Sequence, residues 1–315
     1  MTMLTFIARR IAAGVVLLLV ISLLSYLLLS IPDTDVGRQL LGEGAPQSAV
    51  DAKNASLGLD RPVLAQYADW ASHAVRGDFG TSWFTSEDVT QTLANRLPVT
   101  LSLLLGVTLV TAIVSFLLGV WAGVRRGAVD RVLQVFAVAG YALPGFLVTL
   151  VLVLVFAVNL NWFPAIGYTA FTASPSGWLS TITLPVLSLS VGSVAGISQQ
   201  VRGAVIDVLR QDYVRTLRAR GLSSARIVCK HVLRNASAPA LSLLGMQFVG
   251  LLGGAVIVEQ IFGLPGIGSM TVAYTTRGDI PVIMALVMFT VVGVVLINLA
   301  VDILIGWLNP KARVA

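Results

Sequence analysis

Long uncharged apolar stretches alternate with short polar connections along this chain. A helix that crosses the hydrocarbon core of a bilayer needs about 20 such residues. The uncharged run 132–201 is too long for one span, and the Pro, Gly, Ser and aromatic residues between Asn159 and Thr183 divide it into two. The pattern therefore predicts an all-α integral membrane protein with six transmembrane helices. The expected spans are 11–32, 97–124, 133–158, 182–202, 238–260 and 281–306.

Composition agrees with this pattern, because the 315 residues are 56% hydrophobic and only 11% charged, with a mean hydropathy of +0.88. A soluble chain of this size needs more surface charge, whereas lipid covers much of a membrane protein. The single cysteine, Cys229, excludes an internal disulfide and a multi-cysteine metal site, and two histidines argue against a His-based metal centre. The net charge of +6 does not indicate nucleic acid as a partner, because the basic residues cluster between apolar spans.

The basic residues also predict the orientation. Arg125, Arg126 and Arg131 share one side with loop 202–237 and with both chain ends if the six spans are correct. Short cytoplasmic loops carry the excess of Lys and Arg. Both termini are therefore expected in the cytoplasm, and residues 33–96 are expected outside, as one or two short helices and turns that cap the outer mouth of a pore.

This topology divides the chain into four parts. They are an N-terminal transmembrane helix over 1–32, an extracytoplasmic segment over 33–96, a five-helix core over 97–308 with a cytoplasmic loop over 203–237, and a cytoplasmic tail over 309–315. The first apolar run is too long for the h-region of a signal peptide and no small-residue cleavage site follows it, so an uncleaved span is predicted.

The stretch Gln211–Pro239 is the most basic part of the chain. Charge of this kind is typical of a loop that binds anionic lipid headgroups on the cytoplasmic side. A docking element for a partner protein is the alternative. Counted from Arg202 to Arg234, the basic residues are Arg202, Arg210, Arg215, Arg218, Arg220, Arg226, Lys230 and Arg234, against two acids, Asp207 and Asp212.

The apolar residues of this stretch favour the docking element. Their spacing predicts a helix over 207–220, which Gly221 ends in a left-handed conformation. Ser223 or Ser224 is expected to cap a second helix. Two short amphipathic helices joined at a glycine need the membrane domain, a partner protein or the lipid surface to cover their apolar faces.

A family resemblance follows from the same residues. The sequence D-Y-V-R-T-L-R-A-R-G-L-S (212–223), followed by K-H-V-L-R-N-A (230–236), resembles the EAA loop of ATP-binding-cassette importer permeases. It is most similar to the version in dipeptide and oligopeptide permeases, which also depart from Glu-Ala-Ala at the positions of Arg215, Thr216 and Leu217. Further motifs resemble the B-type subunit over nearly the whole chain, namely L-G-L-D-R-P (57–62), G-D-F-G-T-S (77–82), R-L-P-V-T-L (96–101), Y-A-L-P-G-F (141–146) and V-E-Q-I-F-G-L-P-G-I-G (258–268).

The resemblance implies a type I importer permease fold, with one N-terminal helix before a five-helix core and an extracytoplasmic insertion after helix 1. It also implies a place in the bacterial cytoplasmic (inner) membrane. The expected partners are a homologous C-type permease, two ATPase subunits or one fused ATPase chain, an extracytoplasmic peptide-binding protein and membrane lipid. The residues implied in ATPase coupling are Asp212, Tyr213, Arg215, Thr216, Arg218, Ala219, Gly221, Leu222, Ile227 and Arg234.

This chain is not expected to be an enzyme or to bind a cofactor. It lacks the P-loop pattern G-x-x-x-x-G-K-[ST]. ATP and Mg²⁺ would therefore be bound by the partner ATPase subunits, as the resemblance implies.

Candidate pathway or gate residues are uncharged, with one exception. Gln199 and Gln200 either face a translocation path or form hydrogen bonds between helices. Glu259 is either a gate contact or a carboxylate that accepts backbone N–H groups of the 263–268 turn, and the second interpretation is favoured. Tyr141 and Pro144 complete the set, with a kink expected at the proline.

Two other functions compete with the importer hypothesis. A self-sufficient secondary transporter of small solutes needs ion-coupling carboxylates and an inverted repeat, but the spans offer only Glu259 and Asp302, and no repeat is visible. An intramembrane enzyme needs a convergent catalytic set, which the spans lack. The cargo stays open between oligopeptide, dipeptide and a nickel- or haem-type solute.

Overall fold

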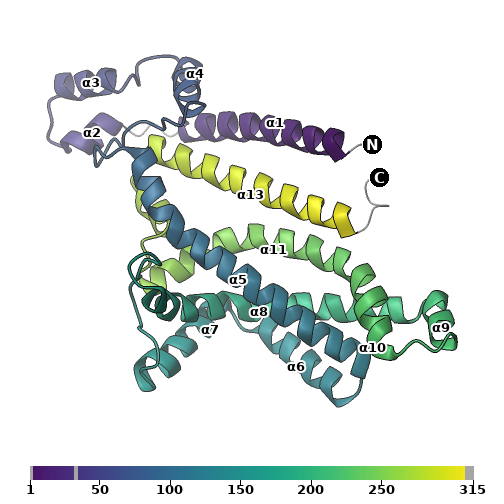
Figure 1. Ribbon diagram of the computed structural model, residues 1–315. Coiled ribbons are helices and arrows are strands. Elements are labelled where there is room, and N and C mark those ends of the chain that lie inside the picture. The colour runs from purple at the N-terminus through teal and green to yellow at the C-terminus, as the bar shows by residue number, and fades with distance from the viewer. Residues whose placement is uncertain (1–2, 32–34, 309–315) are drawn as a thin grey trace. The chain divides into compact units, whose positions relative to one another are not determined.

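The computed structural model describes residues 3–31 and 35–308, and it is helical along most of that length (Figure 1). The predicted tail 309–315 lies outside the described residues. The elements are α1 (Met3–Leu29), α2 (Val36–Leu41), α3 (Gln47–Ser56), α4 (Val63–Ala74), α5 (Val89–Arg125), α6 (Ala128–Ala142), α7 (Gly145–Leu152), the π-helix η1 (Val153–Asn159), α8 (Pro175–Leu209), α9 (Asp212–Ala219), α10 (Ser224–Ile227), the π-helix η2 (Val228–Val232), α11 (Leu233–Phe262), α12 (Ile267–Thr275) and α13 (Ile280–Leu308).

Within the described residues, five helices are long and apolar enough to cross a membrane, and a bent helix pair supplies a sixth span. The prediction of an all-α fold with six spans is thus confirmed. The second expected span, 97–124, lies within α5, which is longer and already begins at Val89, in a polar stretch that hydropathy alone does not assign to a span. The five single spans are Ile7–Leu29, Val89–Arg125, Pro175–Leu209, Pro239–Phe262 and Ile280–Gly306.

The third span is a broken helix. Asp130–Gly140 and Gly145–Asn159 meet at an angle of 102°. Leu143 has an extended backbone (φ −85°, ψ 123°) and Pro144 caps the following α7. A proline disfavours the α conformation of the residue before it, so the kink expected at Pro144 is present as a complete break.

The chain forms two compact units. The first contains Met1–Ile11, Pro98–Ser269 and Val294–Ala315, and the second contains Ala12–Leu97 and Met270–Gly293. In the first unit, Arg10 Nε and Asp302 Oδ2 form an ion pair of 3.0 Å between α1 and α13. Asp302 is therefore the ion-pair partner of an arginine on α1.

Small residues allow α5 and α8 to approach closely in the first unit. A Cβ atom added to Gly119 would lie 2.6 Å from the backbone oxygen of Ser198, and one added to Gly123 would lie 2.8 Å from Val205. Gly119 and Gly123 are one helical turn apart, which is the small-xxx-small spacing of tightly packed membrane helices. Backbone contact between the two helices therefore requires glycine at these positions.

The second unit contains more helix than predicted. Residues 35–96 hold α2, α3 and α4, together with the start of α5, rather than one or two short helices. The side chain of Asp279, which is fully buried, accepts hydrogen bonds from Ser82 Oγ at 2.5 Å and from the backbone N–H of Trp83 at 3.4 Å. This carboxylate links the 81–88 turn to the N-terminus of α13.

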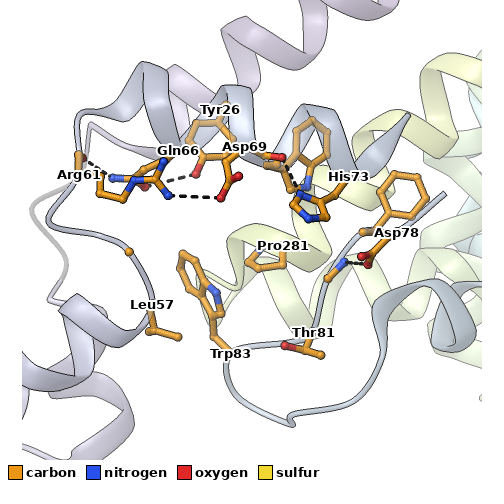
Figure 2. Close-up of a pocket in the computed structure, with 14 residues that line it drawn as sticks. Tyr26, Leu57, Arg61, Gln66, Asp69, His73, Asp78, Thr81, Trp83 and Pro281 are labelled. Carbon is orange, nitrogen blue, oxygen red and sulfur yellow. Dashed lines mark hydrogen bonds and ion pairs between the residues drawn. The ribbon is translucent and has the colours of Figure 1, made fainter. Parts of the chain in front are cut away.

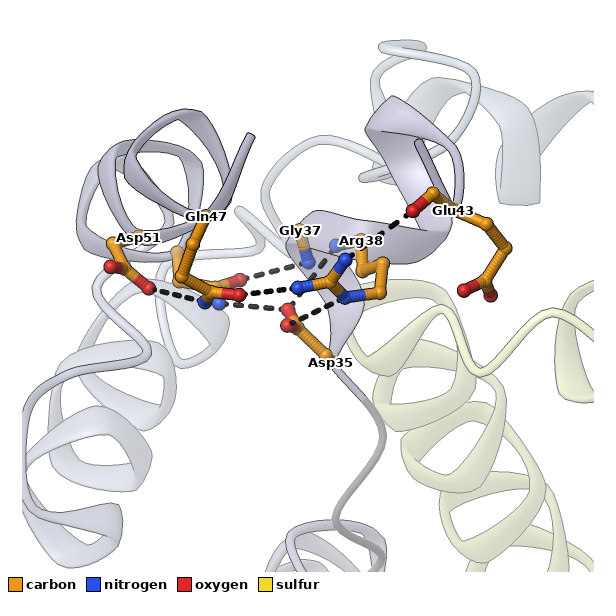
Figure 3. Close-up of polar contacts among 7 residues, drawn as sticks. Asp35, Gly37, Arg38, Glu43, Gln47 and Asp51 are labelled. Atoms are coloured by element: carbon orange, nitrogen blue, oxygen red, sulfur yellow. Dashed lines mark hydrogen bonds and ion pairs between the residues drawn. The ribbon is translucent and has the colours of Figure 1, made fainter. Parts of the chain in front are cut away.

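A polar cluster around Asp35 holds α2 against α3 (Figure 3). Asp35 Oδ1 accepts the backbone N–H of Arg38 at 3.2 Å, which caps α2, and also accepts Asn54 Nδ2 at 2.9 Å. Asn54 Oδ1 in turn accepts the backbone N–H of Gly37 at 2.8 Å. The hydrogen bond from Asn54, with smaller contributions from Arg38, lowers the pKa of Asp35 below its usual value.

We predict that Gly119→Val lowers the thermal stability of the purified protein. The new side chain must displace the α8 backbone, which costs about 1–3 kcal/mol as an overpacking change. Gly253→Val is the matched control, since nothing lies within 4 Å of a Cβ at Gly253. Equal melting temperatures for the two variants in the same detergent would contradict the close α5–α8 packing.

A second prediction concerns pH. Because the pKa of Asp35 is lowered in the folded state, its stabilising contribution is present above the unfolded-state pKa and is lost as pH falls through the lowered value. In Asn54→Ala the Asp35 titration midpoint should rise toward the usual range, as measured by NMR of the carboxyl carbon. Gln47→Ala is the control, since Gln47 bonds Asp51 and Arg38 but not Asp35.

Candidate functional site

The basic segment after α8 has a defined local structure. Its left-handed glycine is confirmed, since Gly221 has φ +78° directly after the end of α9. The N-cap is also confirmed, since Ser223 Oγ accepts the backbone N–H of Arg226 at 3.4 Å. The boundaries of the first helix were wrong. Residues 207–209 belong to α8, and α9 begins only at Asp212, after Gln211 takes an extended conformation.

The second predicted helix is not a separate short helix. The four residues of α10 continue through the π-helix η2 into α11, so the chain stays helical from Ser224 to Phe262. The fifth span, expected from 238, is therefore the distal part of a helix that begins in the basic segment. The apolar periodicity of the basic segment and that of the fifth span could not show that the two belong to one continuous helix.

The segment is anchored by buried valine and isoleucine side chains. Val214 on α9 and Ile227 on α10 have exposed fractions of 0% and 1%, and they belong to one apolar cluster with Val205 and Val208 of α8 and Leu244 of α11. Tyr213 Oη also accepts a hydrogen bond of 2.9 Å from Asn235 Nδ2. The first unit itself thus covers the apolar faces of the two short helices.

The opposite face of this segment is polar and exposed. Tyr213 and Leu222 are half-buried, whereas Ile227 is buried and points inward, so its part in any contact with another protein is indirect. Arg215 forms only an exposed ion pair of 3.4 Å with Asp212, and such pairs contribute little. The side chain of Arg234 lies outside the described part. The exposed members are Asp212, Arg215, Thr216, Arg218, Ala219 and Gly221.

Arg202 lies in α8 and not in the basic loop, although its position in the sequence placed it among the basic residues of loop 202–237. It lies inside α8, where Nη2 is 2.7 Å from Asp130 Oδ2 and Nε also bonds Asp130. The two side chains are 22% and 14% exposed. A bidentate pair of this kind is geometrically specific, and it joins the start of α6 to the C-terminal part of α8.

A cavity of about 710 Å³ lies in the same unit. Gln200 lines it, as expected for a pathway residue, but Gln199 and Pro144 are not among the described lining residues, and the side chain of Tyr141 is outside the described part. No described lining residue is charged. The lining residues are Gly140, Leu143, Gly145, Val148, Ser188, Leu189, Gly192, Ser193, Gly196, Ile197, Gln200, Leu243, Met246, Gln247, Gly250, Leu251 and Gly254.

Two polar residues of the cavity were missed in the sequence. Gln247 Nε2 donates a hydrogen bond of 2.8 Å to Ser193 Oγ, which joins α11 to α8 across the cavity wall. The spacing Gly192-x-x-x-Gly196 and Gly250-x-x-x-Gly254 was the available signal, because small residues at this spacing mark a face where helices or a ligand come close.

Glu259 lies in a buried network rather than on the cavity wall. Its Oε1 accepts Thr100 Oγ1 at 2.7 Å and its Oε2 accepts the backbone N–H of Ser269 at 2.8 Å. Thr100 Oγ1 also accepts the backbone N–H of Ile267 at 2.8 Å. A Cβ on Gly266 would collide with the carboxylate. These contacts are those of a carboxylate that satisfies the first N–H groups of α12.

Comparisons with known proteins agree with this architecture. The chain matches the family described as binding-protein-dependent transport system inner membrane component over residues 115–314, and the N-terminal membrane component of the same systems over 3–104. A protein of Brucella abortus (strain 2308) named for a peptide transport system permease is 34% identical over 312 residues, which is 99% of both chains. The glutathione transport system permease protein GsiC of Salmonella typhi is 34% identical over the same share.

A solved structure shares the fold. A chain from inward-facing conformations of the MetNI methionine ABC transporter superposes with a TM-score of 0.55 at 18% sequence identity, covering 70% of this chain and 97% of that one. The family match and the relatives therefore show that this chain is a multi-pass permease subunit of an ABC transporter, not an enzyme. The chain belongs to the family of binding-protein-dependent transport system inner membrane components.

We predict that Thr100→Val lowers the melting temperature of the protein. The substitution keeps the shape of the side chain but removes its hydroxyl. Both hydrogen bonds of Thr100 Oγ1, to Glu259 Oε1 and from the N–H of Ile267, are then lost, which should lower the free energy of unfolding by about 1–3 kcal/mol. Thr108→Val is the control, because Thr108 Oγ1 bonds only the Leu104 carbonyl of its own helix among the described residues. Equal stability of both variants would contradict a structural role for the network.

Proposed function

We propose that this chain is the transmembrane permease subunit of an ATP-driven importer of oligopeptides or dipeptides. The relatives named above for peptide and glutathione transport support this substrate class, since glutathione is itself a tripeptide. The cavity also supports it. Its described lining is uncharged and contains the side-chain amides of Gln200 and Gln247, which can exchange hydrogen bonds with peptide groups without selecting for side-chain charge.

A homologous C-type permease would complete the translocation path. Met246 and Leu143 line the cavity with exposed fractions of 71% and 52%. Exposed apolar side chains of this size at the edge of an uncharged cavity are expected to face a protein partner or lipid. A second subunit with the same fold would cover these exposed apolar residues and close the open side of the cavity, whose described lining is uncharged and mainly apolar.

We call the basic segment after α8, with α9, the Gly221 turn and α10, the coupling segment. The packing that connects it to the cavity is the observation that carries the proposal. Val214 of α9 and Ile227 of α10 are buried against Val205, Val208 and Leu244. The last three residues belong to α8 and α11, and these two helices also line the cavity. A cytoplasmic ATPase that engages the exposed face of α9 would therefore move both helices with it. ATP and Mg²⁺, bound by the ATPase subunits, would favour one arrangement of the cavity through these differential contacts.

The orientation follows from the same assignment. The coupling segment, both termini and the Arg125–Arg131 connection would lie in the cytoplasm, in agreement with the positive-inside rule. Residues 35–96 would then lie on the outer side, where an extracytoplasmic binding protein delivers peptide.

Gly221→Val tests the coupling role. The residue has φ +78°, a conformation that costs a β-branched residue about 1–2 kcal/mol, so the α9–α10 turn should change. We expect ATP-dependent peptide uptake by the assembled complex in proteoliposomes to fall by about fivefold or more, while the complex still purifies intact. Gly203→Val is the matched control, because Gly203 lies in α8 with negative φ and open space around it.

Two results would contradict this proposal. The first is wild-type uptake by the assembled Gly221→Val complex. The second is uptake by the purified single chain under an ion gradient with no ATPase present, which is the behaviour of a secondary transporter.

A further inference from the structure

A pocket in the second unit has a lining suited to a small polar ligand. Its volume is about 360 Å³, within the range of about 300–1,000 Å³ of small-molecule sites. Figure 2 shows Asp69 and His73 of α4 along one wall and Trp83 on the facing wall, with Pro281 between them. All the lining residues belong to one compact unit.

The charged groups of the pocket sum to an excess of negative charge. Arg61 Nη1 is 3.3 Å from Asp69 Oδ2, so these two groups compensate one another. Asp78 is the second carboxylate, and its Oδ1 accepts the backbone N–H of Gly80 at 2.8 Å. Its other oxygen receives no hydrogen bond from the residues that the structure describes. Asp78 therefore offers a charged acceptor to a ligand.

A histidine adds an uncharged acceptor. His73 Nδ1 is 2.9 Å from the backbone oxygen of Asp69. A carbonyl can only accept, so Nδ1 carries the hydrogen of that bond. In the neutral ring Nε2 is then an acceptor. Carboxylate and imidazole acceptors together favour a ligand that donates several hydrogen bonds and carries a positive charge.

Aromatic rings complete the wall. Trp70 and Trp83 line the pocket, and Trp70 packs against Tyr26 and Tyr67 with ring centroids 6.3 and 6.1 Å apart. Indole faces attract a cation through their quadrupole. Trp70 Nε1 is buried and has no hydrogen-bond partner within the described part of the chain.

We propose that this pocket binds a primary ammonium group, held by Asp78 and His73 between the indole rings of Trp70 and Trp83. An ammonium supplies three donors and one positive charge, which match the acceptors described. Two sources present this group, the amino terminus of a peptide and a lysine side chain of a protein that docks on the outer segment. Naming these sources rests on the proposed function, whereas the binding chemistry does not.

Binding of small probes to the purified full chain in lipid nanodiscs tests the proposal without ATP or partner subunits. Alanyl-alaninamide, its N-acetyl derivative and Nα-acetyl-lysinamide are compared by isothermal titration calorimetry. Alanyl-alaninamide should bind at least about tenfold more tightly than its acetylated form, because acetylation removes a charged hydrogen-bond donor. Tighter binding of Nα-acetyl-lysinamide than of alanyl-alaninamide assigns the source to a lysine side chain, and failure of Nα-acetyl-lysinamide to bind assigns it to a peptide amino terminus.

Substitutions localise the site. Asp78→Asn keeps an oxygen for the N–H of Gly80 but removes the charge, so ammonium binding should weaken by about tenfold. Glu87→Gln removes an exposed charge elsewhere in the same segment and should leave binding unchanged. Equal binding of the acetylated peptide, or unaltered binding by an Asp78→Asn protein with the wild-type melting temperature, would overturn the proposal. Neither result bears on peptide uptake by the complete transporter, which is measured separately.

Discussion

The packing of α8 against α11 is the contact on which the functional part of this protein depends. Both apolar clusters of the first unit include residues from these two helices, and the Ser193–Gln247 hydrogen bond joins them beside the cavity. In a bilayer, water does not drive helices together, so close fit and polar contacts must hold them. Buried contacts to this helix pair thus connect α9 and its exposed face to the cavity.

Much of the fold could be predicted because the bilayer sets the length of each apolar stretch. Gly221 and Ser223 were likewise predictable, since each acts through its own backbone conformation or nearest N–H groups. The start of α5 at Val89 was not, because hydropathy detects contact with lipid and not helicity. The continuity of α10 with α11 was hidden for the same reason.

The site was predicted less completely, because its residues meet across long distances in sequence. Glu259 and Thr100 are 159 residues apart, and no local pattern indicates that they share a hydrogen bond. Arg202 appeared to belong to a basic loop until its partner Asp130 on another helix was known. Gln247 was overlooked because an isolated amide in an apolar helix has no periodic signal. Charge and residue spacing show where along the chain a site lies. Which side chains contact one another becomes known only from the three-dimensional fold.

The six glycines around the cavity have a consequence for how this protein can diversify. At Gly140 a Cβ atom would lie 2.7 Å from Ala195, so a larger residue there would disturb the packing against α8. At Gly145 and Gly250 a Cβ atom would have no neighbour within 4 Å, so a larger residue can be accepted at these two positions and would narrow the cavity by the size of one side chain. The width of the cavity can therefore change by single substitutions at these two positions, while α8 and α11 keep their packing.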